Sequence, residues 1–283
     1  MKNSRRLFIF AGYDASGIID DSALLYARAL SSLGDIIFFM DNNAAESELN
    51  KFRKIPNVLF AGAARHNEYD FGSYKRGFEF AKNHGILENY DWVYFVNDSV
   101  YGPLTPMRGV LEKLESDGSD AVAMVATTRV FKKQKFIESW FWGISPRVFL
   151  LDEFQQFIAG VKRQPTKEAI AAIYERGITD LLCRNNFATA TAYDTGNRGI
   201  YNRPERLFRR GLPFVKKASL TRHNGELGAQ IARILRRTPA PMRAAIMQNA
   251  NRVFGADYMN WLLSAGPLAT TTRKIKYIMT KVF

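Results

Sequence analysis

The chain has 283 residues, of which 47% are hydrophobic, and it carries a formal net charge of +13. This length and composition exclude a disordered or fibrous protein and predict one large domain, or a domain with an appended subdomain, around a sizeable core. The single cysteine, Cys183, excludes an internal disulfide framework and a multi-cysteine metal site. We expect Cys183 to fill core space on a helix.

Positive charge is concentrated in the last third of the chain. Residues 198–283 contain 17 Lys or Arg and 3 Asp or Glu, whereas residues 1–197 are close to neutral. Such an asymmetry indicates an anionic partner for the basic part, and the sequence leaves membrane lipid, phosphates and nucleic acid open.

Residues 1–14 begin with basic side chains, but their apolar run is short, lacks a cleavage-site pattern and meets Asp14. This pattern predicts a first β-strand rather than a signal peptide. No later segment has the ~20 apolar residues of a membrane span. We therefore expect the protein to remain in the cytoplasm.

Strands and helices are predicted to alternate through the first 193 residues. Apolar runs predict strands over residues 7–10, 36–40, 58–61, 92–96, 121–125, 139–144 and 187–193. Helical periodicity with start and stop signals predicts helices over residues 20–33, 73–83, 106–114, 146–158 and 166–184. This alternation predicts an α/β fold with a mostly parallel sheet and helices on both faces.

The pattern changes after residue 193. Residues 194–214 are rich in Gly, Pro, Asn and Arg, which predicts a loop. Two basic amphipathic helices follow, and their apolar faces consist of Leu227, Ile231, Ile234 and Leu235 in the first and Ile275, Ile278, Met279 and Val282 in the second. Packing on the protein's own core and binding to an anionic bilayer both explain such faces. We expect one domain over residues 1–224 and a basic helical extension over residues 225–283.

The segment 90–104, YDWVYFVNDSVYGPL, ends an apolar strand in Asn97, Asp98 and Ser99 ahead of a Gly-Pro pair. An acidic residue at the carboxyl end of a buried strand lies where open α/β sheets bind ligands. That position suits a metal that holds a diphosphate. Ordinary turn chemistry explains the same residue types.

Three further clusters accompany this turn, namely GYDASG at residues 12–17, NEYDFGSYK at 67–75, and a set of basic loop segments at 202–204, 211–217 and 222–224. The first is not a dinucleotide fingerprint, because GxGxxG is absent. In this order the four clusters resemble the rhamnan synthesis protein F family over about residues 7–224. The resemblance implies a GT-A-like α/β fold and a glycosyltransferase that builds rhamnose-containing cell-surface polysaccharides.

The activity implied is transfer of a sugar, expected to be L-rhamnose from dTDP-L-rhamnose, from a nucleotide diphosphate sugar to a hydroxyl of a lipid-linked glycan. Charge develops on the leaving diphosphate, so the site needs a cation near the phosphates and a carboxylate near the incoming hydroxyl. We expect Asp98 to bind Mg²⁺ or Mn²⁺, with Asn97 positioning it and His223 as a second ligand.

The same clusters supply the expected contacts with the donor. The expected nucleotide-sugar-binding residues are Tyr13, Asp14, Asp70, Tyr74, Asn97, Lys216, Lys217 and Arg222. Ammonium and guanidinium groups suit phosphate oxygens, and the aspartates suit the base or the ribose hydroxyls. A turn role for Asp14, a helix-entry role for Asp70 and simple surface exposure of the basic side chains remain open.

Three acids are candidates for the general base. Glu175 comes first, because family 2-type glycosyltransferases place an acidic residue at a similar distance after the metal motif, followed by Asp180 and then Glu138. A solvated helix face explains all three equally. Beside Glu138, we expect at least one of the aromatic residues 140–142 in the core and another against a sugar ring of the acceptor.

Two other functions are compatible with the sequence. The same fold could use another hexose donor, or the basic part could bind nucleic acid or membrane without catalysis, as a sequence pI of about 9.8 allows. Nucleic acid is not expected, because the aromatic residues mostly occupy predicted buried strands and no known RNA or DNA motif is present. We expect an enzyme peripheral to the inner face of the plasma membrane, with its basic C-terminal helices on anionic lipid.

Overall fold

The structure is a computed structural model that describes residues 4–129, 134–196, 198–221, 226–264 and 271–272. The expected site residues Arg222 and His223, and the expected last helix around residues 275–282, lie outside the described residues. In the part of the chain that is described, no helix is long and apolar enough to cross a membrane.

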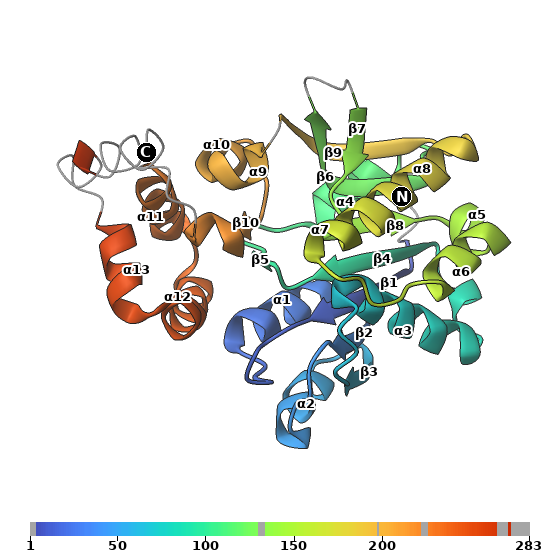
Figure 1. The fold of residues 1–283 in the computed structure, drawn as a ribbon, viewed down its shortest axis with the longest axis horizontal. Helices are drawn as coiled ribbons and strands as arrows, with labels where there is room; N and C mark the ends of the chain where they lie inside the picture. Colours follow the sequence, from blue (N-terminus) through green and yellow to red (C-terminus); the bar gives the residue numbers. More distant parts are fainter. Residues whose placement is uncertain (1–3, 130–133, 197, 222–225, 265–270, 273–283) are drawn as a thin grey trace.

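An eight-stranded mixed sheet forms the centre of the fold (Figure 1). Its strands are β1 (Arg6–Gly12), β2 (Asp35–Met40), β3 (Val58–Ala63), β4 (Trp92–Asn97), β6 (Ala121–Arg129), β7 (Gln134–Ile137), β8 (Phe141–Ile144) and β9 (Thr189–Gly196). The order is β3-β2-β1-β4-β8-β6-β7, with β9 paired to β6. The first four strands in this order are parallel, β8 is antiparallel to both of its neighbours, and β9 is parallel to β6. The expected mostly parallel α/β sheet is confirmed.

Helices cover both faces of this sheet, because alternate residues of the buried strands point to opposite sides. Phe8 and Phe10 of β1 pack with α1 (Asp21–Ser31), α2 (Glu46–Arg53) and α4 (Arg108–Glu115). Leu7 and Ile9 of the same strand pack on the other face, against a second set of helices. That set comprises α3 (Tyr69–Asn83), α5 (Pro146–Phe149), α6 (Asp152–Ala159), α7 (Lys167–Ile170), a π-helical turn (Ala171–Glu175) and α8 (Arg176–Arg184).

Several local expectations differ from the structure. Residues 194–214 contain two short helices, α9 (Gly199–Asn202) and α10 (Pro204–Arg209), the second begun by a proline at its first position. Cys183 is exposed on α8 and does not fill the core. Trp140, Phe141 and Trp142 are all buried in the aromatic core, so none of the three rings is open to a sugar.

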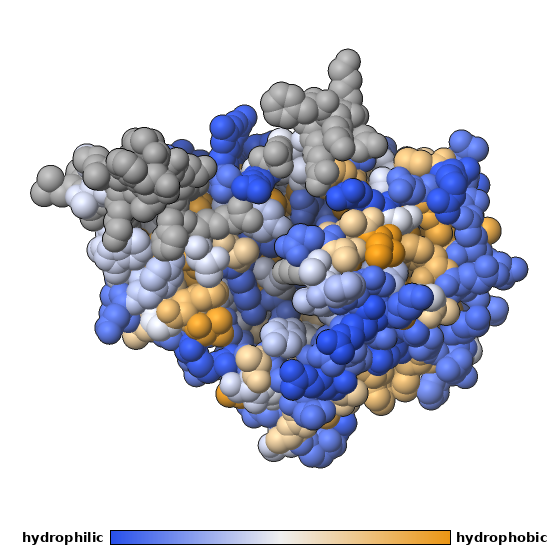
Figure 2. All heavy atoms as spheres, in the orientation of Figure 1, coloured by the Kyte–Doolittle hydropathy of each residue, from blue (hydrophilic) through white to orange (hydrophobic). Residues whose placement is uncertain are grey.

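The C-terminal part is built on a second small sheet, in which β5 (Val100–Tyr101) pairs antiparallel with β10 (Val215–Lys216). A 3-10 turn (Lys217–Leu220) leads from β10 toward α11 (Leu227–Arg237), α12 (Ala240–Phe254) and α13 (Ala256–Leu263). These helices share an apolar cluster with Tyr101, Leu104 and Val215. The apolar face expected on the first C-terminal helix is buried, so α11 packs on the protein's own core. Figure 2 shows a hollow lined with hydrophilic residues between these helices and the body of the sheet.

A buried ion pair joins β1 to α4. The guanidinium of Arg6 donates to both carboxylate oxygens of Glu115 at 2.6 Å, and the Tyr94 hydroxyl donates to the same carboxylate at 2.7 Å. The two charged side chains are 1% and 4% exposed. These contacts hold α4 against the central strands β1 and β4.

Glu115→Ala is expected to lower the free energy of unfolding by about 3–5 kcal/mol, because it leaves a buried guanidinium without its counter-charge. Glu112→Ala on the same helix is the matched control. The Glu112 side chain is 35% exposed and lies 3.9 Å from Arg108, so its loss is expected to cost under about 0.5 kcal/mol. Urea denaturation of the two variants measures both values, and equal midpoints would show that the buried pair contributes no more than the exposed one.

Candidate functional site

The turn after β4 lies beside the loop after β1. Ala11 pairs with Asn97 across the two parallel strands, and the next amide, that of Asp98, donates to the Ala11 carbonyl at 3.1 Å. The Tyr13 N–H in turn donates to Asp98 Oδ2 at 3.2 Å. Because carboxyl ends of parallel strands meet at one edge of a sheet, the register of β1 and β4 brings these two loops together.

Asp98 lies at the edge of the sheet and not in the packed interior. Its side chain is 21% exposed, and Lys217 Nζ lies 3.9 Å from Oδ2. Burial raises the pKa of Asp98 above its ordinary value, although the Lys217 ammonium and the Tyr13 N–H both act to lower it. The carboxylate is therefore reachable from solvent while two protein groups favour its charged form.

Asn97 links the turn to the helix on one face of the sheet. Its side-chain N–H donates to Asp70 Oδ2 at 2.8 Å, and its Oδ1 accepts from the backbone N–H of Ser99 at 3.1 Å and from the Ser99 hydroxyl at 2.5 Å. Asp70 is in the first turn of α3. Tyr74, one turn further along α3, is buried and donates to the Ser139 carbonyl at 2.9 Å. The structure therefore brings the expected residues Asp70 and Asn97 into direct contact and places Tyr74 below them.

The pairing of β10 with β5 carries two lysines to the same turn. Lys216 Nζ donates to the Ser99 hydroxyl at 2.9 Å and lies 5.2 Å from the centre of the Trp140 ring. Lys217 Nζ lies 5.3 Å from the Tyr101 ring centre. Aromatic faces attract ammonium groups, so both lysines are held beside the turn by ring contacts as well as by polar groups.

Two of the three candidate bases flank Ser139 close to this turn. Glu138 accepts from the Thr127 hydroxyl at 2.6 Å, and Glu175 accepts from the Ser139 hydroxyl at 2.5 Å. Burial raises the pKa of Glu138, Lys216 and the Thr127 hydroxyl act to lower it, and the charge of Glu175 acts to raise it. The third candidate, Asp180, is exposed on α8.

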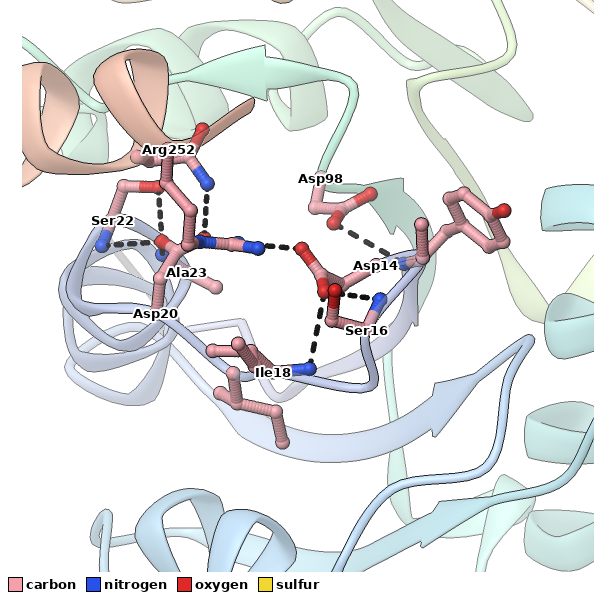
Figure 3. A network of polar contacts seen from close by, with 12 residues as sticks. Asp14, Ser16, Ile18, Asp20, Ser22, Ala23, Asp98 and Arg252 are labelled. Carbon is pink, nitrogen blue, oxygen red and sulfur yellow. Dashed lines mark hydrogen bonds and ion pairs between the residues drawn. The ribbon is translucent and has the colours of Figure 1, made fainter. Parts of the chain in front are cut away.

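Asp14 is held inside the loop that follows β1 (Figure 3). Its Oδ1 accepts from the backbone N–H groups of Ser16 at 2.9 Å and Ile18 at 3.2 Å, and its Oδ2 accepts from Arg252 of α12 at 2.5 Å. Burial acts to raise the pKa of Asp14, but the Arg252 guanidinium and the two N–H donors outweigh it, so the pKa is lowered. The neighbouring residue Tyr13 is 61% exposed.

Three contributors to the site were missed in the sequence. Asp41, directly after β2, accepts from the N–H groups of His66 at 3.0 Å, Asn67 at 2.9 Å and Tyr69 at 3.0 Å, and so shapes the loop before Asp70. Its place after a predicted strand is a usable signal. In the sequence Ser99 has only the pattern of a turn residue. Arg252 carries no local signal, because its partner Asp14 is 238 residues away.

The described residues include no group of three or more His, Cys, Asp or Glu side chains that could hold a metal ion. Asp98 supplies one carboxylate of the hard oxygen type that Mg²⁺ and Mn²⁺ prefer. These ions keep water and substrate phosphates among their ligands, so the chemistry of the single carboxylate fits a substrate-bridged ion.

Comparison with known families decides the class of protein. The profile of the family described as rhamnan synthesis protein F matches residues 36–281. The chain belongs to the rhamnan synthesis protein F family. Its match runs past residue 224, where the resemblance in sequence motifs ended, and includes the C-terminal helices. As a member of this family the chain is a glycosyltransferase.

Solved structures with a similar arrangement are distant in sequence. A protein from Desulfovibrio desulfuricans assigned as a nucleotide-diphospho-sugar transferase is 15% identical, with 87% of this chain and 99% of that chain covered and a TM-score of 0.42. The glycosyltransferase GlyE of Streptococcus pneumoniae is 10% identical, with coverage of 75% and 51% and a TM-score of 0.42. The mannosyltransferase Ktr4p of S. cerevisiae in complex with GDP is 8% identical, with coverage of 54% and 60% and a TM-score of 0.37. The curated proteins include no match to the chain.

Proposed function

We propose that this glycosyltransferase moves L-rhamnose from a nucleotide diphosphate sugar, dTDP-L-rhamnose, to a hydroxyl of a lipid-linked cell-surface polysaccharide. The observation that carries the proposal is the convergence of Asp98, Lys216 and Lys217 at the carboxyl edge of the parallel strands. Ligands of open α/β sheets bind at this edge. Family membership supports the sugar class, because rhamnan is a polymer of rhamnose.

Lys216 and Lys217 are the groups we propose for the diphosphate. Both ammonium groups are held at the turn by fixed contacts, so little side-chain freedom is lost when an anion binds. The exposed ring of Tyr13 offers a flat apolar face for the nucleotide base. Asp14 and Asp70 are proposed to orient the ribose and base, and Arg222, outside the described residues, is proposed as a further phosphate ligand.

We propose Mg²⁺ or Mn²⁺ as the cofactor, held by Asp98 and, as a second ligand, by His223, which is outside the described residues. Such an ion, when bound, neutralises charge that develops on the leaving diphosphate. Two protein groups hold the Asp98 turn in place. The Tyr13 N–H donates to one oxygen of Asp98, and Asn97 links the turn to α3 through its hydrogen bond to Asp70.

For the general base we propose Glu138 or Glu175, with Asp180 as the remaining alternative. The base takes the proton of the acceptor hydroxyl as that oxygen bonds to the sugar carbon, and the bond from that carbon to the diphosphate breaks. Contacts favour the first two, because they flank Ser139 beside Lys216. The raised pKa of Glu138 also favours it, since a base is most effective when its pKa is near the working pH.

A peripheral position at the inner face of the plasma membrane is proposed for the C-terminal helices. Arg236, Arg237 and Arg243 are exposed on α11 and α12. Val253 and Trp261, which are 51% and 44% exposed, provide apolar contacts on the same unit. Exposed basic side chains together with exposed aromatic and aliphatic ones are typical of proteins that bind anionic lipid head groups.

Asp98→Asn is expected to reduce release of nucleoside diphosphate from dTDP-L-rhamnose in the presence of Mn²⁺ by at least about 10²-fold, because it removes the charge that faces the leaving group. Asp117→Asn, at an exposed turn, is the matched control and is expected to retain activity. Melting temperatures measured with and without the donor separate loss of binding from loss of folding. Full activity of Asp98→Asn would remove this carboxylate from the mechanism.

Glu138→Gln and Glu175→Gln are each compared with Asp180→Asn in a measurement of kcat. The variant that lacks the base is expected to lose about 10²–10⁴-fold, and we expect this variant to be one of the first two. If Glu138 is the base, its raised pKa places the acid limb of the pH profile above the ordinary glutamate range, and activity falls as pH drops through that value. Inactivity confined to Asp180→Asn would contradict the assignment.

Replacing Arg236, Arg237 and Arg243 with Gln is expected to release the protein from vesicles that contain anionic lipid, at a cost of roughly 1 kcal/mol of binding per charge. Flotation with neutral vesicles is the reference, and a duplex-binding measurement at the same salt tests nucleic acid as the anionic partner. Undiminished flotation of the triple variant would show that these arginines do not bind lipid.

A further inference from the structure

Helix α12 contacts the two chain segments that flank Asp98. Arg252 donates to Asp14 Oδ2 at 2.5 Å and lies 3.5 Å from Asp20 Oδ2. Asn249, which is 2% exposed, donates to Asp20 and accepts from the Tyr101 hydroxyl at 2.6 Å. One face of a single helix therefore binds both the loop before α1 and the strand that follows the Asp98 turn.

The loop held by Arg252 is the one that orients the Asp98 carboxylate. Asp14 gathers the N–H groups of Ser16 and Ile18, and the adjacent Tyr13 N–H donates to Asp98. Asp20 caps α1 through the N–H of Ser22 at 2.8 Å. Figure 3 shows the Arg252 guanidinium pointing at Asp14, with Asp98 beside the same loop.

Charge gives Arg252 a second effect on this loop. The charges of Asp14 and Asp20 act to raise the pKa of Asp98, so the three carboxylates repel one another. Arg252 pairs with two of them. Loss of this guanidinium would leave that repulsion uncompensated on the loop that carries the Tyr13 N–H.

Asn249 acts on the other side of the turn. Tyr101 follows Asp98 by three residues, and its ring lies 5.3 Å from Lys217 Nζ, the ammonium that approaches Asp98. A hydrogen bond from the Tyr101 hydroxyl to a buried amide fixes the ring position. The Tyr101 ring therefore offers Lys217 a fixed aromatic face.

We propose that Asn249 and Arg252 are positioning residues for the donor site, which makes the C-terminal helical unit a structural part of that site. The inference rests on the proposed role of Asp98 in binding the donor. Arg252 acts through Asp14 on the loop that orients the Asp98 carboxylate, and Asn249 acts through Tyr101 on Lys217. An ion pair that only stabilised the fold would leave the order of these two segments unaffected.

Hydrogen exchange of the full chain tests the positioning without reference to activity. Arg252→Ala is expected to speed exchange in peptides that cover residues 12–20, while Tyr101→Phe, which removes only the hydroxyl, is expected to speed exchange over residues 97–101. Gln248→Ala, exposed on the same helix, is the matched control and is expected to match the unmodified protein. Unchanged exchange in both variants would overturn the proposal.

A kinetic cycle tests the route through Asp14. Arg252→Ala is expected to lower kcat/KM for the nucleotide sugar roughly ten- to a hundredfold, and Arg252→Lys to restore part of the loss. The double variant with Asp14→Ala is expected to lose no more than the worse single variant. Additive losses would contradict the coupling. If the unmodified protein does not use a nucleotide sugar, the proposed function fails while the exchange measurement still decides the positioning.

Discussion

The parallel pairing of Ala11 with Asn97 is the constraint on which the site depends. It sets the loop after β1 beside the turn after β4, so that one backbone N–H, that of Tyr13, reaches the Asp98 carboxylate. A slip of one residue would turn Phe8 and Phe10 to the wrong face of the sheet. The register that fills the core is therefore the same register that builds the site.

The pairing of β5 with β10 adds the positive side of this arrangement. It joins residues about 115 positions apart and brings Lys216 and Lys217 to a turn that otherwise presents acids and amides. The basic residues after residue 198 therefore form two groups. Some of these side chains serve the turn from within the fold, and others, such as Arg236 and Arg237, face solvent.

The sequence predicted what local patterns encode. Apolar runs located the long strands. They also drew attention to the polar residues that follow those strands, and two of these, Asn97 and Asp70, are in direct contact in the structure. It did not predict β5 and β10, because two-residue strands have no period of their own. The sequence did not indicate Arg252, because its role depends on the tertiary packing of α12 on α1. The expectation that Cys183 is buried was wrong, because the side of a helix on which one isolated residue lies is ambiguous from sequence. Arg222 and His223 stay predictions.

The charged form of Asp98 is disfavoured by its surroundings, and groups from three parts of the chain offset this effect. Burial disfavours its charged form, and nearby Asp14 and Asp20 add repulsion. The groups that offset this cost come from three parts of the chain: the Tyr13 N–H from the loop after β1, Lys217 from the segment after β10, and Arg252, through its pairs with the neighbouring acids, from α12. A carboxylate that only capped a turn would be solvated and would need none of them. Their convergence supports the proposed role of Asp98 in binding the donor, because groups already in place around a carboxylate do not have to be reorganised when the ligand arrives.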